Sequence, residues 1–272
     1  MTNSFDSSFI ARFHRMIFRA PGFVAGFILF MMAVSAVDAA PAEYDEAVKQ
    51  YQNGRYEESL QTIRSVFDDN KGVLELRMLA ARNYEKMGNL DSALSHMLYA
   101  TKEHPDAAAP AIYMAKLQHA KGADGRALDI LRRTAGRFAN DPWARYELAA
   151  FFFEQKKYGE ARQQVEAVMA KNPNFFQAVY LDGLIYLVEG SLETAEFRFN
   201  NAARIKMTGQ SWNKRLFNNL GLVNEKLADR ADTAGNPALA KEKRNLAKDY
   251  YKKAVALDGD YAIAKANFDR LN

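Results

Sequence analysis

Apolar and small residues recur along this chain with a period of 34 residues. Three positions of the period hold mostly small or short side chains in five consecutive units. The first column contains Ala47, Ala81, Ala115, Ala149 and Gly183. The second contains Ser59, Ala93, Ala127, Ala161 and Ala195, and the third contains Val66, Ala100, Thr134, Val168 and Ala202. Self-similarity at this fixed period predicts an array of repeated supersecondary units.

A fourth column marks a turn inside each unit. It contains Gly54, Gly88, Gly122, Lys156 and Gly190. Glycine after a helical segment readily adopts the left-handed conformation that ends a helix, so each unit is predicted to be a hairpin of two helices. Lys156 departs from the pattern and predicts a strained or longer turn. Pro105 and Pro173 close their units because proline cannot continue a helix, whereas Pro142 suits the first turn of the helix that it opens.

Small residues let two helix backbones approach closely, and larger apolar side chains fill the grooves between them. On the second helices these larger side chains are Ile63, Met97, Leu131, Val165 and Phe199. This combination of columns resembles the tetratricopeptide repeat family, whose units are paired antiparallel helices. The resemblance covers residues 40–260.

The resemblance implies an all-α protein, an α-α superhelix of about six helical hairpins. The expected units lie near 40–73, 74–107, 108–141, 142–175, 176–209 and 214–260. The sixth unit carries an insertion at 229–243, and residues 229–236 within it are expected to form a loop. A short helix over 261–272 is expected to cap the open end of the stack, since terminal repeats need a soluble outer face.

Residues 1–39 have the pattern of an export signal. A basic leader is followed by an apolar run from Phe23 to Val37, which is shorter than the roughly 20 residues that a membrane span needs. Small residues before Ala40 predict cleavage between Ala39 and Ala40. The alternative is an uncleaved anchor in the inner membrane. Either interpretation predicts that the remainder is exported, in the periplasm or facing it.

Composition narrows the class further. The 272 residues are 49% hydrophobic and 26% charged, which is typical of a folded protein, and the net charge of +4 gives no support for nucleic-acid binding. The chain has no cysteine, which excludes disulfides, thiolate metal sites and cysteine nucleophiles. Residues 200–272 hold 14 basic and eight acidic side chains, a basic end that could meet acidic lipid or protein but is more typical of a solvated helix face.

The sequence contains little that indicates a catalytic site. His96, His104 and His119 are the histidines beyond the leader, and none is expected to pair with a carboxylate or another histidine at metal-ligand spacing. There is no glycine-rich phosphate loop either. We therefore expect no enzymatic activity, no cofactor and no metal site; a hydrolase built on the insertion is the remaining enzymatic alternative.

The resemblance also implies a concave face lined by first helices, where an extended or helical peptide could bind. The candidate groove residues are Tyr44, Arg82, Tyr113, Lys116, Tyr146, Phe153, Tyr180, Leu184, Asn218 and Asn219, and Glu147 is a charged neighbour of them. Tyrosine offers a large contact area at low entropic cost. Aromatic side chains at helical spacing can equally pack between repeats, as Phe153 in particular could. The lysine–asparagine–arginine clamp that some family members use for a peptide's terminal carboxylates is absent.

The sequence thus predicts a non-catalytic scaffold or adaptor of the bacterial cell envelope that binds a segment of another protein in its groove. The alternative function is a membrane-tethered subunit of a multiprotein envelope assembly or secretion complex, with Phe23–Val37 retained.

Overall fold

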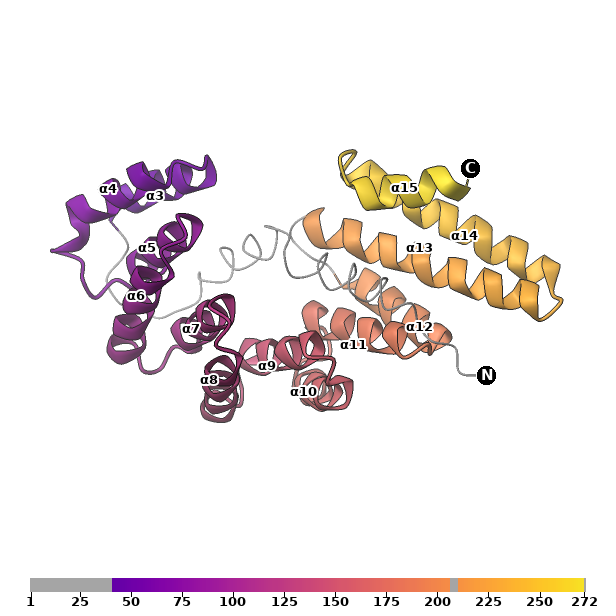
Figure 1. Ribbon diagram of the computed structural model, residues 1–272, viewed down its shortest axis with the longest axis horizontal. Coiled ribbons are helices and arrows are strands. Elements are labelled where there is room, and N and C mark those ends of the chain that lie inside the picture. The colour runs from indigo at the N-terminus through magenta and orange to yellow at the C-terminus, as the bar shows by residue number, and fades with distance from the viewer. Residues whose placement is uncertain (1–40, 206–209, 272) are drawn as a thin grey trace. The chain divides into compact units, whose positions relative to one another are not determined.

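A computed structural model describes residues 41–205 and 210–271 of the chain (Figure 1). These residues form thirteen helices, α3 to α15, and contain no strand. The prediction of an all-α protein built of helical hairpins is confirmed. The expected signal and its cleavage site lie outside the described residues.

The described chain divides into two compact units, residues 41–148 and residues 149–271, with the boundary inside α9. The amino-terminal unit contains α3 (Ala42–Gln52), α4 (Tyr56–Phe67), α5 (Leu74–Lys86), α6 (Leu90–Glu103), α7 (Ala108–Ala120), α8 (Asp124–Arg137) and the start of α9 (Pro142–Glu154). The carboxy-terminal unit contains the end of α9, α10 (Tyr158–Lys171), α11 (Phe176–Val188), α12 (Leu192–Arg204), α13 (Gln210–Thr233), α14 (Pro237–Leu257) and α15 (Ala262–Leu271). Within each unit, helices that follow one another in the chain pack side by side.

The turn column closes the hairpins as its composition predicts. Its glycines have φ values between +76° and +81°. Lys156 has φ +59° in a turn of the same length as the others, so the expectation of strain is confirmed and that of a longer turn is not. A side chain with a Cβ crowds the following carbonyl in this conformation, which costs about 1–2 kcal/mol.

The first two small columns lie in the core of the hairpins, where their side chains are buried. Ser59, which interrupts a column of alanines, is also fully buried. Its hydroxyl donates to the carbonyl of Ala47 at 2.8 Å and accepts from the amide of Asn83 at 2.9 Å. These bonds satisfy a polar group that would otherwise be costly to bury.

The insertion in the sixth unit lengthens both helices of its hairpin. Helix α13 has 24 residues and α14 has 21, and residues 229–233 are helical. The expectation of a loop over 229–236 was therefore wrong in its first five residues. The break is confined to residues 234–236. It contains Gly235, at φ +72°, and Asn236, whose side chain accepts from the backbone of Leu239 and caps α14. Residues with good helical propensity on both sides leave no other place for the chain to turn.

Helix α15 packs on α14, and its side chains also reach α13. Ala264 is fully buried, Asn267 donates to Asn218 at 3.1 Å, and Arg270 pairs with Glu225. Among the described residues, no helix is both long and apolar enough to cross a bilayer.

Candidate functional site

In the amino-terminal unit, polar side chains link successive first helices. The hydroxyl of Tyr113 on α7 donates to a carboxylate oxygen of Glu85 on α5 at 2.5 Å. Burial raises the pKa of Tyr113 well above its usual value, and the neighbouring Glu85 carboxylate raises it further. The phenol therefore stays protonated and remains a hydrogen-bond donor.

A second link joins α7 to α9. The ammonium group of Lys116 lies 2.6 Å from a carboxylate oxygen of Glu147, whose side chain is only 6% exposed. Because a buried carboxylate without a counter-charge is costly, Lys116 compensates the charge of Glu147 and links the two helices.

Arg82 on α5 is buried near these links. Its positive charge acts on three tyrosines at once. Burial raises the pKa values of Tyr44, Tyr51 and Tyr113, and in each case the guanidinium of Arg82 opposes that rise. We name Tyr44, Arg82, Glu85, Tyr113, Lys116 and Glu147 the first-helix cluster. It combines charges of alternating sign with tyrosine rings that are partly exposed at Tyr44 and Tyr113.

The sequence prediction included five of these six residues, four as groove residues and Glu147 as a charged neighbour of them. It gave no role to Glu85. Glu85 and Tyr113 are 28 positions apart, whereas Lys116 and Glu147 are 31 positions apart, and the latter spacing is a usable signal for that link. That separation is one period less one helical turn, which brings neighbouring first helices into register.

Tyr146 and Phe153, both on α9, are buried rather than available to a ligand. Tyr146 is 4% exposed and meets Trp143 edge to face with ring centroids 5.9 Å apart. Phe153 is fully buried and its ring lies 5.4 Å from that of Tyr158. Their prediction as groove residues is corrected: the helical offset that points toward a groove also points toward a neighbouring helix.

The candidates of the carboxy-terminal unit are buried too. Leu184 is 1% exposed and belongs to the core. Tyr180, Asn218 and Asn219 form an interior network, in which Asn219 donates to the hydroxyl of Tyr180 at 2.8 Å. Asn267 of α15 donates to Asn218, so these amides join helices to one another. The prediction of a ligand-facing role for these four residues is corrected, because packing and internal hydrogen bonds already use them.

The ring of Tyr180 lies in an aromatic cluster. It stacks on Phe176 with an interplanar angle of 8°, and Trp212 meets both rings edge-on. Burial raises the pKa of Tyr180. This cluster joins α11 to α13, so Tyr180 contributes to the packing of these two helices.

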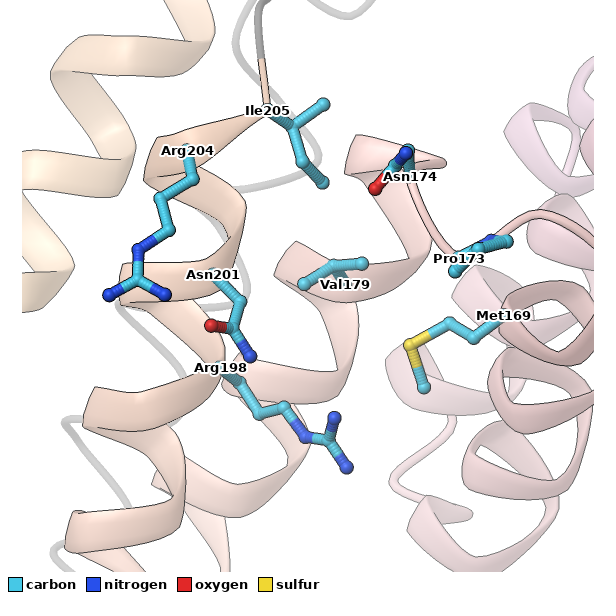
Figure 2. Close-up of a pocket in the computed structure, with 8 residues that line it drawn as sticks. All are labelled: Met169, Pro173, Asn174, Val179, Arg198, Asn201, Arg204 and Ile205. Carbon is cyan, nitrogen blue, oxygen red and sulfur yellow. The ribbon is translucent and has the colours of Figure 1, made fainter.

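A surface pocket of about 690 Å³ lies in the carboxy-terminal unit (Figure 2). Its walls come from the end of α10, the loop that follows, α11 and α12. The lining residues are Met169, Pro173, Asn174, Val179, Arg198, Asn201, Arg204 and Ile205. Arg198 forms an ion pair with the buried carboxylate of Asp182 at 2.8 Å, so its charge is largely compensated within the protein. Figure 2 shows the side chain of Arg204 leaving α12 on the side away from Met169. The pocket therefore presents weakly charged, mixed polar and apolar walls.

One histidine of the described residues pairs with a carboxylate. His119 lies 2.6 Å from Asp124, and the pair links the end of α7 to the first residue of α8. Within the described ranges, no group of three or more histidine, aspartate or glutamate side chains is arranged to hold a metal ion.

The repeat architecture agrees with the comparisons to known proteins. Residues 119–181 match the tetratricopeptide repeat family. A tetratricopeptide repeat protein from Parabacteroides merdae is similar in structure, with a TM-score of 0.60 and 14% identity over 84% of this chain and 82% of the other. PilF from Pseudomonas aeruginosa has a TM-score of 0.57 and 12% identity, over 84% of this chain and 96% of the other. TTC0263 from Thermus thermophilus has a TM-score of 0.54 and 15% identity, over 73% of this chain and 98% of the other. No curated protein matches the sequence.

The chain therefore has the fold of tetratricopeptide repeat proteins, and residues 119–181 match that family. Proteins with this fold generally act as non-catalytic scaffolds for protein interactions. At these identities the likeness to solved structures concerns the fold alone.

Proposed function

We propose that this protein is a non-catalytic scaffold of the bacterial cell envelope and that the first-helix cluster of the amino-terminal unit binds a peptide segment of a partner protein. The observation that carries the proposal is the pair of links between first helices, Tyr113 to Glu85 and Lys116 to Glu147. They fix polar side chains in place on a surface where the ring of Tyr113 and the stem of Lys116 remain partly exposed.

Fixed side chains favour binding because less conformational freedom is lost when the partner arrives. Alternating charges favour a partner that itself carries both signs, since electrostatic complementarity selects register and suppresses wrong partners. The exposed parts of Tyr44 and Tyr113 supply aromatic contact area.

Site-specific photocrosslinking in the native envelope tests this proposal. A benzophenone amino acid replaces Tyr113 in one variant and Tyr99 in another. Tyr99 is the matched control because it lies in the same unit on the second helix α6 and is 54% exposed. We expect a discrete crosslinked partner from position 113 and none from position 99. Crosslinks from position 99 alone would show that another face binds.

The envelope location rests on residues 1–39 and is a separate part of the proposal. Fractionation followed by N-terminal sequencing tests it. A periplasmic chain that begins at Ala40 is the expected result. A chain recovered from the cytoplasm would contradict the envelope role.

The alternative is a membrane-tethered subunit of an envelope assembly or secretion complex. The features that favour it are the long leader of 22 residues before the apolar run Phe23–Val37 and the imperfect residue Asp38 in the predicted cleavage site. An intact N-terminus in the inner-membrane fraction would favour this alternative over the cleaved form.

A further inference from the structure

Five of the six basic residues of helix α14 fall into two groups. Lys243 and Arg244 face the rest of the carboxy-terminal unit. Lys243 pairs with Glu196 of α12 at 2.9 Å, and Arg244 pairs with Asp232 of α13 at 2.5 Å. These two charges are compensated within the fold.

Lys241, Lys248 and Lys252 form the second group, which we name the α14 lysine stripe. Spacings of seven and four residues place them within about 40° of one another around the helix and along about 16 Å of its length. The buried face of α14, which contains Ala240, Ala247 and Tyr251, points in a different direction. Across the part of the chain that the structure describes, none of the three lysines has an ion-pair partner.

The other charged residues of α14 do not neutralise the positive charge of the stripe. Glu242 and Asp249 are exposed on the same helix, but they lie about 80–100° to one side. The sixth basic residue, Lys253, is also exposed on that side, with its ammonium group 5.1 Å from the ring centroid of Tyr250.

This arrangement suits a flat surface of diffuse negative charge. Lysine presents a hydrated point charge on a flexible stem, unlike arginine, whose planar group recognises carboxylates and phosphates in pairs. A straight row of such charges can follow a layer of anionic headgroups, and each lysine near that layer adds to the attraction. We propose that the α14 lysine stripe binds the surface of a membrane containing anionic phospholipid. This inference does not depend on the peptide-binding cluster.

Vesicle sedimentation with the full chain tests the inference. The vesicles contain phosphatidylcholine with about one third phosphatidylglycerol, or phosphatidylcholine alone. The variant Lys241→Gln/Lys248→Gln/Lys252→Gln should bind anionic vesicles at least about tenfold more weakly than the unchanged chain, and high salt should remove the difference. Residues 1–40 are present in every variant, so their own affinity for lipid does not alter the comparison.

The matched control is Lys49→Gln/Lys86→Gln/Lys102→Gln. It removes three exposed lysines from α3, α5 and α6 and so changes the net charge equally. We expect it to bind anionic vesicles within about twofold of the unchanged chain. Circular dichroism and thermal unfolding establish that both variants are folded. A stripe variant that binds as well as its control would overturn the proposal, as would stripe-dependent binding to polyglutamate or duplex DNA without binding to vesicles.

Discussion

At the residue scale, a glycine on the first helix of a hairpin compensates for a large aromatic side chain on the second helix. Gly183 and Gly221 stand where earlier units have alanine, and each faces an aromatic residue on the second helix of its hairpin. A Cβ at Gly183 would lie 2.6 Å from the ring of Phe199, and one at Gly221 would lie 2.5 Å from the ring of Tyr251. Both rings are fully buried, so they have little room to move.

We expect Gly183→Ala to lower the free energy of unfolding by about 1–3 kcal/mol, because the added methyl group overpacks the contact with Phe199. The control is Gly159→Ala in α10, where a Cβ meets no atom within 4 Å. Urea denaturation of both variants measures the difference. The double variant Gly183→Ala/Phe199→Leu should regain part of the loss; equal effects of the two glycine substitutions would refute the packing argument.

A substitution at Lys156 should change the free energy of unfolding in the opposite direction. Replacement by glycine removes the crowding of its Cβ at φ +59° and should raise the free energy of unfolding by about 1 kcal/mol. Lys157→Gly serves as the comparison because Lys157 has a negative φ of −87°. Thermal unfolding of the two variants should shift in opposite directions, and a destabilised Lys156→Gly variant would contradict the strain.

At the element scale, His96 ties α6 to the two preceding helices. Its ring lies 5.9 Å from that of Phe67 on α4 and 5.5 Å from that of Tyr84 on α5. Burial lowers the pKa of His96 below its usual value near 6.5, and the positive charges of Arg77 and Arg64 lower it further. The folded protein therefore favours the neutral imidazole.

A dependence of stability on pH follows. Below pH 6.5 the unfolded chain binds a proton at His96 that the folded chain resists, so the free energy of unfolding should fall as the pH decreases from 7 toward the lowered pKa. His96→Phe keeps an aromatic ring in the contact and should show a smaller loss over that interval. Urea midpoints at several pH values measure both proteins. Parallel profiles would show that His96 does not contribute.

The long hairpin of α13 and α14 also belongs to this scale. Arg244 reaches across it to Asp232, and Tyr251 donates to Glu225 at 2.9 Å. Burial by itself would raise the pKa of Glu225, but hydrogen bonds from Arg270 and Tyr251 lower it below its ordinary value. The extra length of the hairpin is thus stabilised by contacts between its two helices.

At the scale of the whole molecule, each hairpin depends mainly on its neighbours in the chain. Helix α15 protects the last hairpin through Asn267 and Arg270, which bond to Asn218 and Glu225 of α13. Loss of α15 should therefore destabilise the last hairpin and leave distant hairpins nearly unchanged.

Deletion of residues 259–272 should accelerate amide hydrogen exchange in α13 and α14 and leave α3 to α6 nearly unchanged, since stability in a repeat array is a sum of local terms. The milder variant Asn267→Ala/Arg270→Ala should give a smaller change in the same helices. Exchange measured by mass spectrometry compares them with the unchanged chain. Uniform acceleration over all helices would contradict local stabilisation.

The candidate site could be predicted only in part. Tyr44, Arg82, Tyr113 and Lys116 belong to the first-helix cluster as their columns suggest, although Arg82 is buried. Nearly every residue of α11 is buried, and this helix is apolar on all sides. An offset from the small column therefore cannot separate a partly exposed side chain such as Tyr113 from a packed one such as Tyr180.

The sequence alone determined the hairpins, their order and their turns, because the period of 34 residues, the small columns and the turn glycines act over short distances along the chain. Tertiary structure decided which polar side chains form hydrogen bonds with one another. The links between Tyr113 and Glu85 and between Asn267 and Asn218 join residues 28 and 49 positions apart. Such pairings depend on how neighbouring hairpins stack, and a buried polar group must find its partner wherever that stacking places one.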